Sequence, residues 1–257
     1  QRTLQSLQAA AAAAREAGCV DHVSVWLVDN ASSQDYRRLL QQQLDAWPQS
    51  AGISLYCEWL PSNGGFGAGH NVMLPRLTSD FHLVLNPDVQ LAPDALQVGL
   101  FVLSREPYIA LLSPRVAAAG GGQEFLCKRY PSVLVLLLRG FAPRILRQLF
   151  HRRLAMYEMR DACATDTAVD VIIASGCFML LRTSALRAVE GFDEGYFLYF
   201  EDFDLSLRLH AQGRLVFEPA MRIIHHGGYA ARKGWLHVRY FIRSGRRFFD
   251  RHGWRWI

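Results

Sequence analysis

Acidic and aromatic side chains are concentrated in one stretch of the chain, from Gly191 to Arg208, with the sequence GFDEGYFLYFEDFDLSLR. Carboxylates are seldom surrounded by aromatic rings unless they are used, because burying a charge is costly. The pair Glu201 and Asp202 directly precedes a short helix that we expect from Phe203 to Gln212. Free backbone N–H groups in a first helical turn favour the ionised form of a carboxylate. The pair is therefore either a catalytic group or a set of helix-capping acids.

Polar side chains recur where expected strands and turns end. The motifs are VDNAS with Asp29 and Asn30, NGGFGAGHN from Asn63 to Asn71, LNPDV with Asn86 and Asp88, and RIIHHGG with His225. Ligands of open α/β sheets bind at the carboxyl ends of strands. The glycine loop does not satisfy G-x-G-x-x-G, so a dinucleotide-binding site is disfavoured. The loop is either a turn that caps a helix or a close backbone approach to a diphosphate.

These motifs, in this order, resemble the family 2 inverting glycosyltransferases of GT-A fold, specifically the rhamnosyltransferase-like branch that extends cell-surface polysaccharides. The resemblance covers residues 1–226. It implies one α/β domain with a single Rossmann-like, mainly parallel sheet flanked by helices. In that family a further strand precedes the first helix, so we expect a strand missing upstream of residue 1.

The resemblance also implies roles for individual residues. Asp202 would be the catalytic base and Glu201 would bind the acceptor, with exchanged roles left open. Asp88 and His225 would hold Mg²⁺ or Mn²⁺, with Asn86 replacing the first acid of a DxD motif. The residues implied in donor binding are Asp29, Asn30, Gly65, Asn86 and Asp88.

The implied reaction moves one sugar from a dTDP- or UDP-sugar, with L-rhamnose from dTDP-rhamnose as the first choice, to a lipid-linked, lipopolysaccharide or cell-surface polysaccharide acceptor. The segment HGWRW, His252 to Trp256, lacks the glutamine of the processive Q-x-x-R-W motif, which favours addition of a single sugar. A galactofuranosyl- or other hexosyltransferase that uses a UDP-sugar is the alternative. The alternative from a different class is a non-catalytic protein that binds a membrane or nucleic acid. No nucleic-acid binding module is recognisable in the sequence, so we expect no nucleic-acid partner.

Amino-acid composition and net charge further narrow the class of protein and its expected partners. The 257 residues are 51% hydrophobic, enough for one substantial core. The net charge of +5, almost entirely arginine, indicates an anionic partner such as a membrane or a phosphorylated substrate. The five cysteines form no CxxC motif, which favours reduced thiols and a cytoplasmic location. The longest apolar run, Val133 to Leu138, is far shorter than the roughly 20 residues that span a bilayer.

Apolar periodicity predicts alternating helices and strands, the pattern of a mainly parallel sheet. Expected helices are 4–14, 34–46 and 93–105, and expected strands are 23–28, 53–60, 82–86, 108–116 and 171–181.

Two segments differ from this core, a basic amphipathic insertion at 133–159 and a basic aromatic C-terminal helical segment at 227–257. Arginines alternate there with leucine, phenylalanine and tryptophan. Such helices suit a peripheral anchor in the plane of a membrane, here the inner face of the cytoplasmic membrane. Alternatively, they pack on the core or on another subunit of a homo-oligomer.

Overall fold

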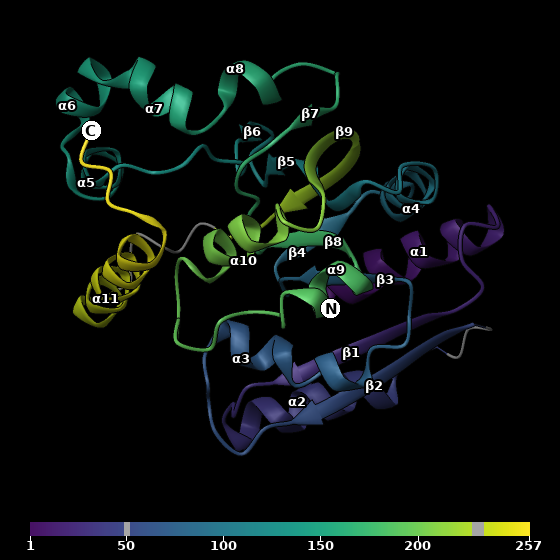
Figure 1. Ribbon diagram of the computed structural model, residues 1–257. Coiled ribbons are helices and arrows are strands. Elements are labelled where there is room, and N and C mark those ends of the chain that lie inside the picture. Colours follow the sequence, from purple (N-terminus) through teal and green to yellow (C-terminus); the bar gives the residue numbers. More distant parts are fainter. Residues whose placement is uncertain (49–51, 228–233) are drawn as a thin grey trace.

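The computed structural model describes residues 1–48, 52–227 and 234–257, which form an α/β fold (Figure 1). The first half contains α1 (Arg2–Glu16), β1 (Val23–Asp29), α2 (Gln34–Asp45), β2 (Ile53–Trp59), α3 (Phe66–Asn71), the 3-10 helix η1 (Leu74–Arg76), β3 (Phe81–Leu85), β4 (Val89–Leu91), α4 (Ala95–Arg105), β5 (Ile109–Ala118) and β6 (Gln123–Glu124). The second half contains α5 (Val133–Phe141), α6 (Arg144–Leu149), α7 (His151–Tyr157), α8 (Arg160–Cys163), β7 (Val169–Asp170), β8 (Phe178–Arg182), α9 (Thr183–Ala188), α10 (Glu201–Leu209), β9 (Arg214–His225) and α11 (Trp235–His252).

The strands of the described residues form two hydrogen-bonded sheets. Strands β1 and β2 pair in parallel, and a seven-stranded sheet has the order β3-β8-β5-β9-β4, with β6 on β5 and β7 on β9. In the larger sheet only β5 and β9 are parallel. The prediction of a single, mainly parallel sheet is therefore wrong in this respect, and the sheet is mixed. Strand β3 pairs with β8, which comes much later in the sequence. Local hydrophobic periodicity indicates where a strand lies, but not whether it runs parallel or antiparallel to its neighbour.

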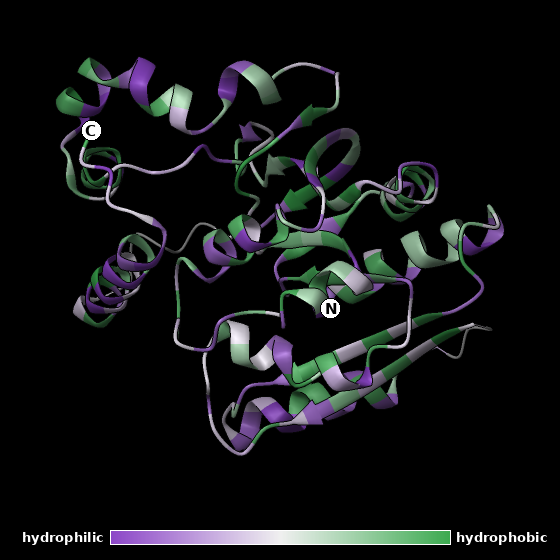
Figure 2. Cartoon of the chain, viewed as in Figure 1, coloured by the Kyte–Doolittle hydropathy of each residue, from purple (hydrophilic) through white to green (hydrophobic). Residues whose placement is uncertain are grey.

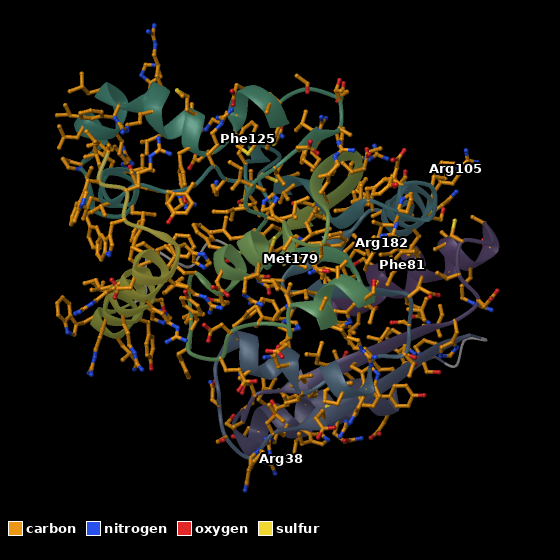
Figure 3. All side chains as sticks on the ribbon, in the orientation of Figure 1. Arg38, Phe81, Arg105, Phe125, Met179 and Arg182 are labelled. Atoms are coloured by element: carbon orange, nitrogen blue, oxygen red, sulfur yellow. The ribbon has the colours of Figure 1, made fainter. Side chains whose placement is uncertain are left out.

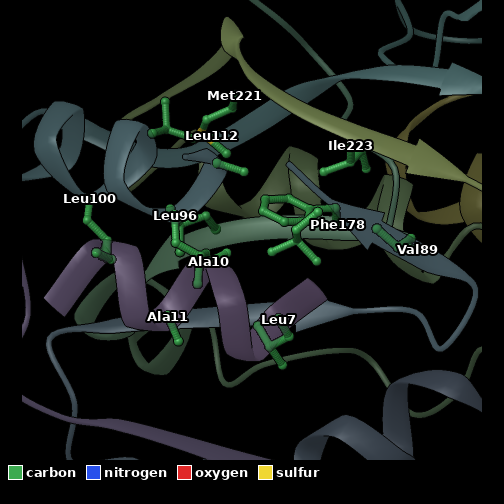
Figure 4. Packing of buried hydrophobic residues seen from close by; sticks show 14 of the residues in the cluster. Leu7, Ala10, Ala11, Val89, Leu96, Leu100, Leu112, Phe178, Met221 and Ile223 are labelled. Atoms are coloured by element: carbon green, nitrogen blue, oxygen red, sulfur yellow. The ribbon is translucent and has the colours of Figure 1, made fainter. Parts of the chain in front are cut away.

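One core cluster lies between the larger sheet and the helices α1 and α4 (Figure 4). Ala10 and Ala11 of α1 are fully buried, so this helix approaches the sheet closely. Leu96 of α4 and Phe178 of β8 belong to the same cluster. Gly18, with φ of +69°, follows α1 in the left-handed conformation that glycine adopts readily.

One expected strand is shorter than predicted. Residues 171–181 were expected to form one strand, but β8 begins only at Phe178, and Ile173 makes an isolated bridge with Lys128. The intervening Gly176 gives its backbone N–H to the side chain of Asp202. A strand ladder would have used these backbone groups, so the candidate site interrupts the strand.

The two amphipathic segments pack together beside α10, on the side away from β1 and β2 (Figure 1). Buried Leu136 of α5, Tyr157 of α7 and Phe248 of α11 form one cluster with Phe200. Both hydrophilic and hydrophobic residues recur along α11 (Figure 2). Residues 228–233 of the predicted C-terminal segment lie outside the described residues. Within the described ranges, no helix combines the length and hydropathy needed to cross a bilayer.

Candidate active site

Asp29, at the carboxyl end of β1, is buried in a polar pocket. Its Oδ2 accepts hydrogen bonds from Arg37 Nε at 2.7 Å and from Ser32 N at 3.3 Å. Burial alone would raise the pKa of Asp29, but the hydrogen bonds from Ser32 and Arg37 lower it below its usual value. Its Oδ1 is buried without a hydrogen-bond partner among the described residues. Asp29 therefore carries a negative charge and has one buried acceptor oxygen without a partner among the described residues.

Asn30 holds the glycine loop in place. Its Nδ2 donates to Gly65 O at 2.8 Å, and its Oδ1 accepts from Gly64 N at 3.2 Å. Gly65 has φ of +98°, and a Cβ there would lie 2.3 Å from Phe197 O. The close backbone approach at Gly65 is therefore to the aromatic stretch before α10. A role for Asn30 and Gly65 in donor binding stays a prediction.

Contacts link this loop to the acid pair and onward to Asn86. A Cβ on Gly176 would lie 3.3 Å from both Asp202 Cβ and the Phe66 ring. Asp202 Oδ2 accepts from Gly176 N at 2.9 Å. The next residue, Cys177, accepts from Asn86 N at 2.9 Å through its carbonyl. Residues from four distant parts of the sequence thus form one continuous region.

Glu201 and Asp202 are the first two residues of α10, which spans Glu201–Leu209 and so begins earlier than the expected helix from Phe203 to Gln212. Burial, together with the neighbouring Asp202 charge, raises the pKa of Glu201. Burial also raises the pKa of Asp202, although N–H groups of Gly176 and Phe203 donate to it and act in the opposite direction. The N–H groups therefore favour the ionised form of Asp202, as expected, but burial outweighs them. A coupled pair of this kind shares a proton over a range of pH.

Asp88 and His225 come together because β4 pairs with β9 in the register Val89 to His225. His225 Nε2 lies 3.6 Å from Asp88 Oδ2. The buried Oδ1 atoms of Asp88 and Asn86 have no hydrogen-bond partner among the described residues. A Cβ on Gly227 would lie 2.6 Å from His225 Nε2, so glycine keeps this space open.

Asp88 and His225 fit one divalent cation as a pair of protein ligands. Metal–ligand distances of about 2.1 Å place two ligand atoms of one ion roughly 3–4 Å apart, which matches the observed separation. No group of three or more His, Cys, Asp or Glu suited to hold a metal occurs in the described part of the chain. Mg²⁺ and similar ions leave most positions to water and substrate phosphates. His226, the weaker candidate, lies instead 3.1 Å from Gln90 Oε1 through Nε2.

The sequence prediction missed Glu124. Its Oε2 lies 3.0 Å from His225 Nδ1, the nitrogen opposite the one that faces Asp88. A carboxylate there holds the proton on Nδ1 and leaves the Nε2 lone pair for a metal. Glu124 belongs to the two-residue strand β6, after a run of glycines, and nothing in its local sequence indicates this partner.

A cavity of about 390 Å³ opens beside the acid pair. Glu201 and Asp202 line it together with aromatic residues of the stretch before α10. Arg139 of α5 and Phe241 of α11 complete its wall. The amphipathic segments therefore contribute directly to the candidate site, which their composition alone did not predict.

The comparisons with known proteins agree with the motifs. A family model described as "Glycosyltransferase like family 2" matches residues 2–231. The chain belongs to this family. An N-acetylglucosaminyl-diphospho-decaprenol L-rhamnosyltransferase of Mycobacterium tuberculosis is 31% identical over 220 residues, which cover 79% of this chain and 66% of that protein. Rhamnosyltransferase WbbL of Escherichia coli K12 is 29% identical over 215 residues, covering 80% and 74%. The chain thus spans just under two thirds of the mycobacterial relative.

Solved structures confirm the predicted GT-A fold of this family 2 chain. GalNAc-T7 with UDP, GalNAc and Mn²⁺ aligns with a TM-score of 0.62 and 15% identity, covering 88% of this chain and 41% of that one. TarS 1-349 of S. aureus in complex with UDP aligns with a TM-score of 0.53 and 15% identity, covering 97% and 67%. At this identity the likeness is one of fold.

Proposed function

We propose that this protein is an inverting, metal-dependent glycosyltransferase that adds one L-rhamnose, from dTDP-rhamnose, to a lipid-linked or polysaccharide acceptor. One observation carries the proposal: the buried acid pair lines a cavity and is joined by direct contacts to the segment of Asn86 and Asp88. Two relatives named as rhamnosyltransferases support the sugar. A hexosyltransferase that uses a UDP-sugar is the alternative within the same family.

Asp202 acts as the base in this proposal. It takes the proton of an acceptor hydroxyl while that oxygen attacks the anomeric carbon and the bond from this carbon to the donor phosphate breaks. One displacement inverts the configuration at that carbon. The raised pKa of Asp202 makes it a stronger base than an ordinary carboxylate. Glu201, kept neutral by burial, donates a hydrogen bond to the acceptor.

The donor lies along the strand ends. Asp29 binds the base or ribose, with Asn30 and Gly65 nearby. Asp88 and His225 Nε2 would hold Mg²⁺ or Mn²⁺, and such an ion, when bound, neutralises charge on the departing diphosphate.

The test is Asp202→Asn. We expect transfer from dTDP-rhamnose to fall about 1,000-fold, the scale of general base catalysis. Binding of dTDP with Mn²⁺, measured by calorimetry, stays within about twofold of the wild type, a difference below about 0.5 kcal/mol. Asp35→Asn, on the exposed face of α2, is the matched control and leaves transfer unchanged. Comparable turnover in Asp202→Asn would remove Asp202 as the base, and a panel of dTDP- and UDP-sugars identifies the donor.

We also propose that α6 rests on an anionic membrane surface. None of its residues is buried, and Ile145 and Leu149 are 77% and 72% exposed beside Arg144 and Arg147. Arginines attract anionic headgroups while apolar side chains enter the interface.

Sedimentation with vesicles tests this surface. The double variant Ile145→Ser, Leu149→Ser should lose most binding to anionic vesicles. Tyr108→Ser, at an equally exposed position elsewhere, should retain it. If the double variant loses a dimer and keeps its binding to vesicles, the surface mediates self-association.

A further inference from the structure

The cavity beside the acid pair has walls of two kinds. Tyr199 and Phe203 line it near α10, and Phe241 lines it from α11. Arg139 adds a positive charge from the last turn of α5. A ligand that fits this site has a face for aromatic stacking and an anionic group next to it.

The guanidinium of Arg139 lies next to the side chains of Tyr157 and Glu158. Its Nε lies 3.4 Å from Glu158 Oε1, while Glu158 Oε2 accepts from Arg160 Nε and Nη2 at 2.8 and 2.6 Å. The Glu158 charge is therefore already offset by Arg160. The Arg139 side chain is 47% exposed, so incoming phosphate oxygens can reach it.

Arg139 and Asp202 lie close enough together to influence the same side chain. Burial raises the pKa of Tyr157, with Arg139 opposing the increase and Asp202 adding to it. Both charged groups also line the cavity. An acceptor whose hydroxyl lies at Asp202 therefore has its neighbouring atoms near Arg139.

We propose that Arg139 binds the phosphate that links the acceptor sugar to its apolar carrier, and that the rings of Tyr199, Phe203 and Phe241 hold the sugar and the first carrier atoms. This inference rests on the proposed glycosyl transfer. It assigns the acceptor's phosphate to α5, in the basic amphipathic insertion. Arg139 is thus a residue that selects phosphate-linked acceptors over neutral glycans.

The donor diphosphate is a less suitable partner for Arg139. The candidate metal ligands Asp88 and His225 lie where β4 pairs with β9. Helix α5 packs with α7 and α11, on the side of α10 away from β1 and β2 (Figure 1). A donor diphosphate held at Asp88 and His225 leaves Arg139 for a second phosphate, that of the acceptor.

Binding of farnesyl diphosphate, with excess chelator, tests the site independently of turnover. Chelation removes metal-dependent binding near Asp88. We expect Arg139→Gln to weaken binding about 10-fold or more, the scale of a hydrogen bond to a charged group. Arg139→Lys, which keeps the charge, should lose less. Asp88→Ala should bind as the wild type does, and so should Arg38→Gln, whose side chain points away from the molecule at its far end (Figure 3).

Each other outcome overturns the inference. Failure of the wild type to bind the probe removes the site. If Asp88→Ala weakens binding of the probe and Arg139→Gln does not, the diphosphate of the probe binds at the donor side. Equal binding of inorganic pyrophosphate removes the role of the aromatic walls, and equal binding of farnesol removes the role of the charge.

Kinetics provide a second readout. With an acceptor sugar linked through a diphosphate to a short isoprenoid, Arg139→Gln should raise the acceptor KM about 10-fold and leave the donor KM unchanged. With the same sugar on a neutral alkyl chain, the two enzymes should have the same KM. An equal rise in KM for both acceptors contradicts the inference. Failure of the proposed function is distinct, because it abolishes transfer in the wild type and leaves probe binding intact.

Discussion

The two sides of the candidate site are built differently. On one side, Asp29 ends β1, and Asp88 and His225 meet through the pairing of β4 with β9. On the other side, Arg139 and Phe241 come from helices that pack outside the sheet. Strand register fixes the first set to the central fold, whereas the packing of separate helices fixes the second. A fold can thus keep one donor side and change its acceptor side by changing the added helices.

The helical side is nevertheless tied firmly to the core. Asp204 of α10 has a fully buried side chain and accepts from Arg208 Nε and His252 Nε2, each at 2.7 Å. His252 is the last residue of α11. The chain after α11 returns to α5, where Val133 N donates to Arg255 O at 2.8 Å. The cavity wall therefore depends on a buried charge as well as on apolar packing.

The largest effect that we expect comes from removing this charge. Asp204→Asn leaves Arg208 and His252 without their ionic partner and should lower the free energy of unfolding by about 3 kcal/mol. Because Asp204 joins α10 to α11, binding of farnesyl diphosphate should weaken with it. Urea denaturation followed by far-UV circular dichroism measures the change.

Asp35→Asn is the control, because the Arg38–Asp35 pair is exposed and contributes little. A stability for Asp204→Asn within 0.5 kcal/mol of the wild type, about the spread of surface substitutions, would show that α11 is held by its apolar face alone.

A smaller effect is expected on the strand side. Glu124→Gln replaces the carboxylate next to His225 Nδ1 with a group that no longer fixes the tautomer. Mn²⁺-dependent binding of dTDP, measured by calorimetry, should weaken about 10-fold, while binding of farnesyl diphosphate under chelation stays constant. Glu218→Gln is the matched control, since Glu218 Oε1 accepts from Ala220 N within β9. Equal losses in both variants would exclude a specific role for Glu124.

The strand side was the more predictable one from sequence. Motifs that follow buried strands locate Asp29 and Asp88, because each strand's carboxyl end is set by local periodicity. Expected elements such as the helix at 34–46 match α2, Gln34–Asp45, to within one residue. Family membership and fold class followed from the same motifs and are confirmed.

The helical side and the strand directions were not predictable. Arg139 is one of several arginines in its segment, and only packing against α7 and α11 separates it from the others. Glu124 meets His225 across 101 residues of sequence. The sheet is mixed because β8 pairs antiparallel with β3 and β5, and the local hydrophobic pattern does not encode that pairing. Long-range contacts, rather than residue types, carry this information.

The smallest effect concerns the acid pair, where the two sides meet. The pKa of Glu201 is raised in the folded protein, mainly by burial, so folding favours its protonated form. Its contribution to stability is complete below the unfolded pKa and is lost as pH rises through the folded value. Glu201→Gln should therefore gain stability relative to the wild type between pH 5 and pH 9, by about 1 kcal/mol because Asp202 shares the proton. Urea midpoints at each pH measure this, with the exposed Glu106→Gln as control. Parallel pH profiles for wild type and Glu201→Gln would show that the acid pair is not coupled to folding.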